Sequence, residues 1–302
     1  MKLRPDFLII GMERSGTLWT SAILNEHPEI ASFPNLPFKI SADEIRAGEV
    51  HFFNTLVSLE PNTEGKFTRP LSDYLTKCGQ VFADLVPLAD KVPKEEFYRL
   101  MIKRYSDYCD RQRGDKKIVG ESTPAYVFYL DFIDSFYPGI KKICSIREPK
   151  DKITSWHFNL LRKGRKTEKL ITEEFALDYV KTRIVKEYEA LLEYKGPVHC
   201  ITYEMMSYNP QKTVQGLLDY LEIGTSDEVI ARMIHSASFE EMTRRHSKKV
   251  GRKRGEEDPQ ESLRRGVVGD WKNHIDEDLA LSIDTAVAPF RKEVFKKYGL
   301  EG

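Results

Sequence analysis

The stretch FLIIGMERSGTLW, residues 7–19, decides the fold of this chain. Its apolar start, Phe7–Gly11, predicts a buried strand, and Thr17–His27 carries apolar residues at helical spacing and ends before Pro28. A glycine-containing turn between a strand and a helix presents several backbone N–H groups and a helix N-terminus to one point. The stretch therefore predicts an anion-binding turn at the end of a strand.

Short apolar runs that alternate with helical patterns recur along the chain. Further strands are predicted at Ile118–Gly120, Lys142–Ile146 and Val198–Tyr203, and further helices at Glu95–Arg111, Lys150–Arg162, Glu173–Tyr194 and Pro210–Leu221. Strands separated by helices of this length form βαβ units and a parallel sheet. We predict one α/β domain over residues 1–302, with a central parallel sheet flanked by helices and a P-loop-like turn after the first strand.

Two segments stand outside this pattern. Ile30–Gly79 contains scattered Pro and Gly and is predicted to form loops and short helices over one end of the sheet. Arg244–Arg265 has dense positive charge and almost no apolar residues, which on composition alone is typical of a solvated loop.

The composition limits the classes of function. With 47 Lys+Arg against 47 Asp+Glu in 302 residues, the net charge is zero, which excludes proteins that bind nucleic acid through bulk positive charge. No stretch approaches the roughly 18 apolar residues of a membrane span. The cysteines are widely spaced and form no CxxC, so neither a metal site nor a disulfide framework is indicated, and a cytoplasmic location is expected. They are Cys78, Cys109, Cys144 and Cys200.

The first turn differs from the Walker A loop of kinases, GxxxxGK[ST]. Its glycine spacing fits, but Thr17 occupies the lysine position and the cation comes earlier, at Arg14. The strand Ile143–Ile146 ends in Arg147, where a magnesium-binding Asp would be expected. A metal-dependent kinase therefore fits poorly, and a phosphate site neutralised by arginine without a metal fits better.

A second motif makes the pattern specific. The segment REPKDKITSWHF, residues 147–158, places Arg147 at the carboxyl end of a strand, where ligands bind in open α/β sheets, and Ser155 eight residues later. Together with Arg14–Trp19, it resembles the sulfotransferases that use 3′-phosphoadenosine 5′-phosphosulfate (PAPS). The resemblance implies that Arg14, Ser15, Gly16, Thr17, Leu18 and Trp19 form the 5′-phosphosulfate loop. It also implies that Arg147 and Ser155 bind the 3′-phosphate.

Two later stretches extend the resemblance over most of the chain. SLRRGVVGDWK, residues 262–272, is similar to the RKGxxGDWK segment of the cytosolic-type members and implies that Arg264, Arg265 and Gly266 surround the 3′-phosphate. Leu18 replaces a threonine often seen in that group. The family's adenine contacts imply that Trp19, Tyr203 and Phe239 surround the purine, although each aromatic taken alone is more typical of the core.

The general base is less well defined. An acceptor hydroxyl must lose its proton as the new bond forms, so a Glu or His is required near it. EVHFFN, residues 49–54, resembles the ExxFF segment of the carbohydrate sulfotransferases, which implies Glu49 as the base, with His51 as the alternative. A surface carboxylate and an aromatic-packed histidine are the competing interpretations. ESTPAY, residues 121–126, resembles the same group, with Ser122 in place of a lysine.

The resemblance implies metal-independent, in-line transfer of the sulfuryl group from PAPS to a hydroxyl or amine of a small-molecule, lipid or carbohydrate acceptor. Arg14 would have a catalytic role at the leaving phosphate. The alternatives are a P-loop kinase and a non-catalytic protein that binds PAPS or its product PAP. Asp276-Glu277 stand where the family's dimer motif needs Thr-Val, so a monomer is expected. Since Arg265 must reach the 3′-phosphate, Arg244–Arg265 is interpreted as a lid.

Overall fold

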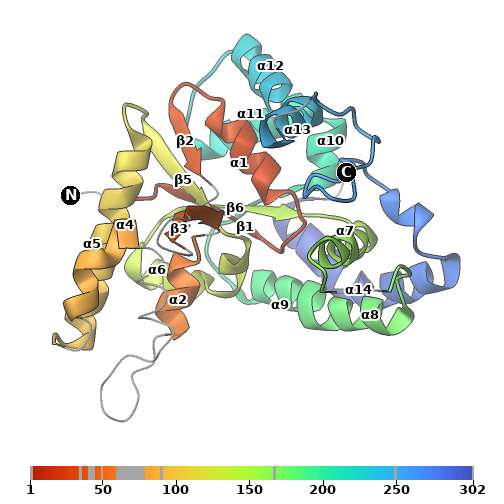
Figure 1. Cartoon of the computed structure of the whole chain (residues 1–302), viewed down its shortest axis with the longest axis horizontal. Helices are drawn as coiled ribbons and strands as arrows, with labels where there is room; N and C mark the ends of the chain where they lie inside the picture. Colours follow the sequence, from red (N-terminus) through yellow and green to blue (C-terminus); the bar gives the residue numbers. More distant parts are fainter. Residues whose placement is uncertain are drawn as a thin grey trace.

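The computed structural model describes residues 3–33, 36–39, 45–48, 50–58, 79–88, 91–165, 168–247 and 250–300. A five-stranded sheet lies at its centre, with all neighbouring strands parallel and the order β2-β5-β1-β6-β7 (Figure 1). Its strands are β1 (Phe7–Gly11), β2 (Ile30–Phe33), β5 (Ile118–Ser122), β6 (Lys141–Ile146) and β7 (His199–Thr202). A separate antiparallel pair is formed by β3 (Leu36–Lys39) and β4 (Ile45–Gly48). The predicted α/β fold with a parallel sheet is confirmed.

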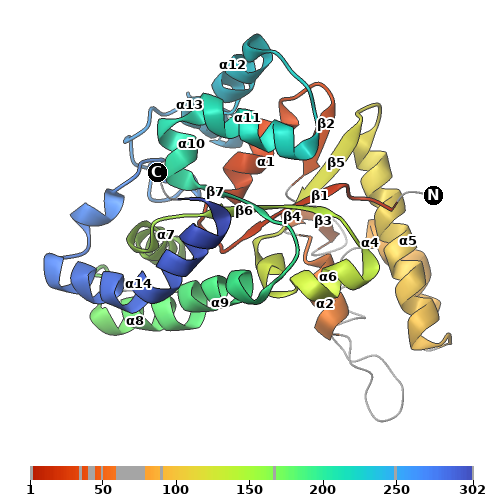
Figure 2. The same ribbon diagram turned by 180° about the vertical axis from the view of Figure 1, so that it is seen from behind.

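Helices cover both faces of this sheet (Figures 1 and 2). They are α1 (Thr17–Asn25), α2 (Phe52–Ser58), α4 (Gly79–Phe82), α5 (Lys94–Arg113), α6 (Leu130–Phe136), α7 (Pro149–Arg162), α8 (Glu173–Tyr179), α9 (Val185–Glu193), α10 (Tyr203–Tyr208), α11 (Pro210–Leu221), α12 (Asp227–Ser236), α13 (Phe239–Ser247) and α14 (Glu277–Tyr298).

The central strand explains why the sheet is covered on both sides. All five residues of β1 are buried, and successive side chains in a strand point to opposite faces. Phe7 and Ile9 join the apolar cluster that includes residues of α1, α11 and α12. Leu8 and Ile10 join the larger cluster, which includes residues of α5, α7, α9 and α14. A strand buried on both faces requires the continuous apolar run seen in the sequence.

The strand order brings the chemically informative segments to one edge. β1 lies between β5 and β6, and Gly11 at the end of β1 is in register with Ser145 of β6. The turn after β1, Ser122 at the end of β5 and Arg147 after β6 therefore meet at the carboxyl edge of the sheet, where ligands bind in folds of this class.

Three details of the predicted elements are wrong. Ile30–Phe33 is the edge strand β2 rather than part of an irregular segment, because it pairs with β5 over Ile118–Glu121. The predicted helix Glu173–Tyr194 is divided by a π-helical turn at Val180–Ile184. Arg244–Ser247 belong to the last turn of α13, so only the residues after them leave helical structure.

Among the described helices, none combines the length and the apolar character that crossing a bilayer requires.

Candidate functional site

The turn between β1 and α1 is tightly folded. The Ser15 N–H donates to the Met12 carbonyl oxygen (3.3 Å), and Arg14 has a φ of 71°. Gly16 begins α1 with a φ of 96°, and a Cβ at this position would lie 2.8 Å from the Tyr203 ring. Glycine is therefore required here by both conformation and space. The Ser15 side chain is only 1% exposed, yet its Oγ has no hydrogen-bond partner in the described part of the chain.

Arg14 turns from this loop towards α7 and towards residues 250–272, which we call the C-terminal segment. Its Nε donates to Ser155 Oγ (2.9 Å) and its Nη2 donates to the Ser262 carbonyl oxygen (3.0 Å). Burial, together with the nearby charge of Arg147, lowers the pKa of Arg14 to about 10. The guanidinium therefore stays charged at neutral pH, in surroundings that lack the negative charge it needs.

Arg147, directly after β6, links the turn to the C-terminal segment. Its Nη1 donates to the Arg14 carbonyl oxygen (3.3 Å) and its Nη2 to the Val267 carbonyl oxygen (3.1 Å). Its guanidinium carbon lies 4.2 Å from the centre of the Tyr203 ring. The Nε is buried without a hydrogen-bond partner among the described residues, so Arg147 keeps a donor for a ligand.

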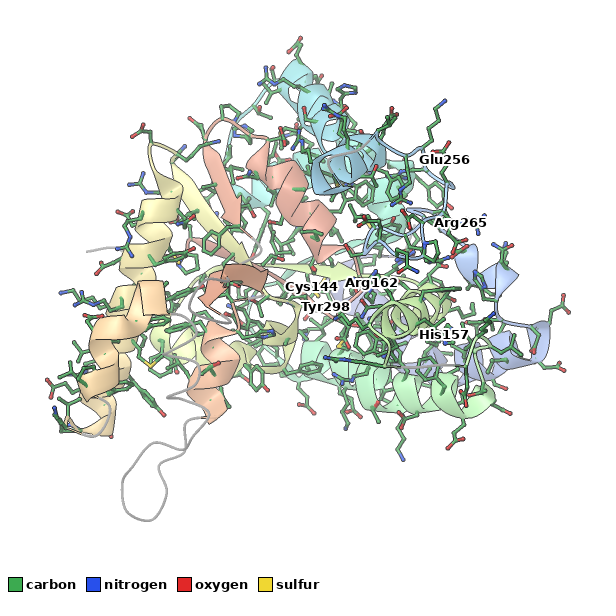
Figure 3. All side chains as sticks on the ribbon, viewed as in Figure 1. Cys144, His157, Arg162, Glu256, Arg265 and Tyr298 are labelled. Carbon is green, nitrogen blue, oxygen red and sulfur yellow. The ribbon has the colours of Figure 1, made fainter. Side chains whose placement is uncertain are left out.

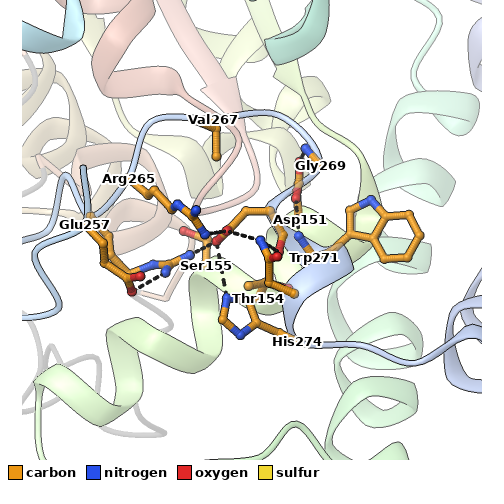
Figure 4. Close-up of polar contacts among 12 residues, drawn as sticks. Asp151, Thr154, Ser155, Glu257, Arg265, Val267, Gly269, Trp271 and His274 are labelled. Atoms are coloured by element: carbon orange, nitrogen blue, oxygen red, sulfur yellow. Dashed lines mark hydrogen bonds and ion pairs between the residues drawn. The ribbon is translucent and has the colours of Figure 1, made fainter. Parts of the chain in front are cut away.

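Two carboxylates hold the C-terminal segment in place (Figure 4). Asp151, in the first turn of α7, accepts the N–H groups of Gly269 (2.8 Å) and Trp271 (3.0 Å). Asp270 forms ion pairs with Arg264 and with Arg265, the latter at 2.6 Å. Burial opposes ionisation of Asp270, but His274 and Arg264 outweigh it and hold the pKa of this carboxyl well below its usual range.

Aromatic side chains line the other end of the site. The Trp19 and Tyr203 rings lie 5.2 Å apart at 58°, and Trp19 Nε1 donates to the Ala237 carbonyl oxygen (2.9 Å). The guanidinium of Arg254 lies 4.7 Å from the centre of the Trp19 ring. A Cβ on Gly266, whose φ is 70°, would come within 2.4 Å of the Phe239 ring.

These side chains surround a cavity of about 380 Å³. The predicted nucleotide-binding residues that line it are Arg14, Gly16, Thr17, Leu18, Trp19, Arg147, Ser155, Tyr203, Phe239, Arg264, Arg265 and Gly266. Ser15 is the exception and lies buried within the turn. The structure thus brings together five segments that are widely separated in the sequence.

Comparison with known proteins gives the family. The family described as "Sulfotransferase domain" matches residues 4–299. The chain belongs to the sulfotransferase family. This confirms the resemblance to PAPS-dependent sulfotransferases that the motifs indicated.

The relatives and neighbours of this sulfotransferase are distant. "Cytosolic sulfotransferase 12" of Arabidopsis thaliana is 26% identical over 181 residues, which are 53% of this chain and 52% of the relative, so the chain spans about half the length of that relative. The structure of mouse sulfotransferase SULT7A1 complexed with PAP has a TM-score of 0.52 at 17% identity, over 96% of this chain and 86% of the other. A sulfotransferase from Alicyclobacillus acidocaldarius also has a TM-score of 0.52 at 17% identity, over 98% and 96%. Both structures share the fold.

The segment in which the general base was predicted lies partly outside the described residues. Glu49 lies outside the described residues. His51 has a φ of 50°, and its N–H donates to Thr123 Oγ1 (3.4 Å), but it does not line the cavity. The N–H of Phe52 donates to the Tyr126 hydroxyl (2.8 Å). The two segments with carbohydrate-type motifs therefore pack against each other.

Glu121, the first residue of the second segment, is a buried carboxyl that the sequence analysis placed in a motif without giving it a role. Tyr105 donates to its Oε2 (2.6 Å), and Thr123 donates to its Oε1. Burial raises the pKa of Glu121 to about 7. Its hydrogen bonds to Tyr105 and Thr123 hold the end of β5 in place. The neighbouring residues Ser122 and Pro124 line the cavity, whereas Glu121 does not.

Several functional positions were missed by the sequence analysis. Asp151 and Asp270 lie inside recognised motifs, but their role as counter-ions and backbone acceptors depends on contacts between segments. Further cavity-lining residues not predicted are Trp156, Asn159, Arg162, Lys163, Met242 and Arg254. The spacing of Ser155, Asn159 and Arg162, four and then three residues, could have shown that they share one helix face.

Within the described residues, no group of three or more His, Cys, Asp or Glu side chains could hold a metal ion.

Proposed function

We propose that this sulfotransferase moves the sulfuryl group of PAPS to a hydroxyl or amine of an acceptor. The observation that carries the proposal is the pair of guanidiniums, Arg14 and Arg147, that line one cavity with Ser155 at the carboxyl edge of the sheet, where Arg14 donates to the Ser155 hydroxyl. Two guanidiniums this close together in a partly buried site favour an anionic ligand, although Asp151 lies 3.7 Å from Arg147.

The residues present fit a nucleotide with two anionic groups. Ser15 Oγ and Arg147 Nε are buried polar atoms without partners among the described residues, as expected where a ligand supplies the missing partner. Gly16 and Gly266 both occupy positions where a Cβ would collide with an aromatic ring. The fit therefore rests on the shape of the cavity as well as on its charge.

Each part of the cavity has a proposed role. Arg147, Ser155, Arg264, Arg265 and Gly266 hold the 3′-phosphate, because they lie together where α7 meets the C-terminal segment. Trp19, Tyr203 and Phe239 surround the purine, because a nucleotide base stacks favourably on the face of an aromatic ring. The turn from Arg14 to Leu18, with the N-terminus of α1, holds the 5′-phosphosulfate.

PAPS, as the cosubstrate, supplies the sulfuryl group and the phosphate that leaves. The acceptor oxygen forms the new S–O bond while the bond between sulfur and the oxygen of the 5′-phosphate breaks, and the electron pair of that bond goes to the phosphate. Arg14 stabilises this developing charge and, since arginine stays protonated, acts as an electrostatic group rather than a proton donor. Glu49 takes the acceptor proton, with His51 as the alternative.

Titration calorimetry tests which nucleotide the protein binds and whether binding requires Mg²⁺. We expect PAP to bind without Mg²⁺ and ATP to bind more weakly; binding that required Mg²⁺ and favoured ATP would instead support a P-loop kinase. Transfer of labelled sulfate from PAPS to sugars, phenols and lipids tests the reaction. PAP binding with no transfer to any acceptor would favour the non-catalytic alternative.

The base is tested separately. Glu49→Gln should abolish turnover and leave PAP affinity unchanged, with His51→Gln as the matched comparison. Unchanged turnover in Glu49→Gln would exclude this residue as the base.

Two further expectations are part of the proposal. A cytoplasmic location is supported by the name of the Arabidopsis relative, "Cytosolic sulfotransferase 12". A monomer is supported by Asp276-Glu277 at the position of the family's dimer motif.

A further inference from the structure

One wall of the cavity carries more positive charge than the proposed nucleotide site uses. Trp156, Asn159, Arg162 and Lys163 all line the cavity and all belong to α7 or the residue that follows it. Ser155, Asn159 and Arg162 share a helix face, and Arg162 lies about 10 Å along the helix axis from Ser155. This wall therefore continues beyond the proposed 3′-phosphate site.

Arg162 differs from three of the other arginines of the cavity, Arg147, Arg264 and Arg265. Its Nη2 donates to Asn159 Oδ1 (2.9 Å), while its Nε is buried without a hydrogen-bond partner among the described residues. By contrast, Arg264 and Arg265 are paired with Asp270, and Arg147 lies 3.7 Å from Asp151. No ion pair joins Arg162 to any carboxylate in the described ranges.

The carboxylates that line the cavity are engaged elsewhere. Asp151 and Asp270 hold the C-terminal segment, and Glu13 lies 3.7 Å from Arg183. The positive charge of Arg162 is also felt at Arg14, whose pKa it lowers. Arg162 thus extends the positive potential from the proposed sulfuryl end of the cavity along α7, with no counter-ion of its own in the described structure.

This wall also has a flat apolar surface. The Trp156 ring stacks on Tyr179 with centroids 6.0 Å apart and planes at 29°, and Tyr179 contributes to the electrostatic surroundings of Arg14. In the view of Figure 3, Arg162 lies between the central sheet and the segment that carries Arg265. The purine-side residues Trp19, Tyr203 and Phe239 come from α1, α10 and α13 instead.

We propose that Arg162, oriented by Asn159, binds an anionic oxoacid group on the acceptor, so that the enzyme selects acceptors that carry a carboxylate, phosphate or sulfate ester near the hydroxyl to be modified. A guanidinium with free donors suits all three groups, since each presents several oxygens to a planar fork of N–H donors. The inference rests on the proposed function, because it assigns the nucleotide to the remaining arginines.

The test uses matched acceptors on two scaffolds. One set is methyl glucoside with its glucuronide, 6-phosphate and 6-sulfate forms; the other is 4-hydroxyphenethyl alcohol with 4-hydroxyphenylacetate and the phosphate ester of the alcohol. Affinities are measured by calorimetry with PAP-saturated enzyme, and turnover is measured with labelled PAPS. The glucoside set distinguishes carboxylate, phosphate and sulfate, and the phenol set distinguishes carboxylate and phosphate.

We expect wild-type enzyme to bind at least one anionic member about tenfold or more tightly than its neutral parent, as a charge-assisted hydrogen bond predicts. Arg162→Gln should remove that preference, and Arg162→Lys should keep part of it. Arg165→Gln is the matched control, because Arg165 is exposed just beyond the same helix and does not line the cavity.

Two results would overturn the inference: equal affinity for the anionic and neutral members, or a preference that survives in Arg162→Gln. Failure of the proposed function would look different, since PAP would then not bind or no acceptor of either charge would be sulfated. Transfer to neutral acceptors alone would retain the proposed function and remove only the role of Arg162.

Discussion

The substitution Arg14→Met should weaken PAP binding and at the same time stabilise the free protein. Burial and neighbouring cations lower the pKa of Arg14 to about 10. An ordinary arginine has a pKa of at least about 12.5, and one pKa unit corresponds to about 1.4 kcal/mol, so the charged side chain is destabilised by about 3 kcal/mol in the absence of an anion. A cation whose pKa is lowered by folding destabilises the folded state at every pH below its folded-state pKa. The loss of stability is therefore fully present at neutral pH.

Methionine removes the charge but also two hydrogen bonds. The bonds to Ser155 Oγ and to the Ser262 carbonyl oxygen contribute about 1 kcal/mol each. The free variant should therefore be more stable than wild type by about 1 kcal/mol, which for a domain of this size raises Tm by roughly 2 °C. PAP affinity should fall about 100-fold, since a buried charge-assisted contact to phosphate is lost.

Thermal unfolding with and without PAP, together with calorimetry, measures both quantities. The matched control is Arg291→Met, because Arg291 pairs with Glu148 at 3.1 Å and does not line the cavity. The reasoning is refuted if Arg14→Met lowers Tm while PAP affinity stays at the wild-type value, since Arg14 would then be a structural residue.

Three other changes test separate parts of the site. Gly266→Ala should weaken PAP binding at least about tenfold, because the new Cβ would collide with Phe239 at a positive φ; wild-type affinity by calorimetry would contradict this. Between about pH 4.5 and 7 the native state holds a proton on Glu121 that the unfolded state releases, so stability should fall by up to about 3 kcal/mol as the pH rises. Glu121→Gln should lack this slope in urea titrations across that range. Finally, PAP should protect Arg244–Arg265 from trypsin, and an unchanged cleavage rate would argue against a lid.

Much of the fold could be predicted because its signals are local. The central strands are short apolar runs next to helical patterns, and burial on both faces leaves such a run in the sequence. β2 was missed because Ile30–Phe33 is a four-residue run whose identity as a strand depends on pairing with β5. The π-helical turn at Val180–Ile184 was missed for a similar reason, since the hydrophobic pattern runs through it without a break.

The site was predictable where residue types within one motif carry the chemistry. Arg14, Arg147 and Ser155 were predicted from their motifs, and the structure brings them to one cavity; their roles stay predictions. Asp151 and Asp270 were not, because their function is to hold other segments, and such contacts depend on the tertiary structure. Arg162 was placed in a predicted helix, but only the cavity shows which way that helix faces.

The zero net charge of the chain conceals how the arginines are used. Beside the cavity, guanidiniums donate to backbone carbonyls of the irregular C-terminal segment: Arg14 to Ser262, Arg147 to Val267, Arg252 to Leu263 and Arg264, and Arg265 to Gly255. These carbonyls have no strand or helix partners, so the arginines satisfy them in place of secondary structure. An anion bound to the same guanidiniums competes for these donors. We therefore predict that the affinity for nucleotide and the conformation of residues 250–270 change together.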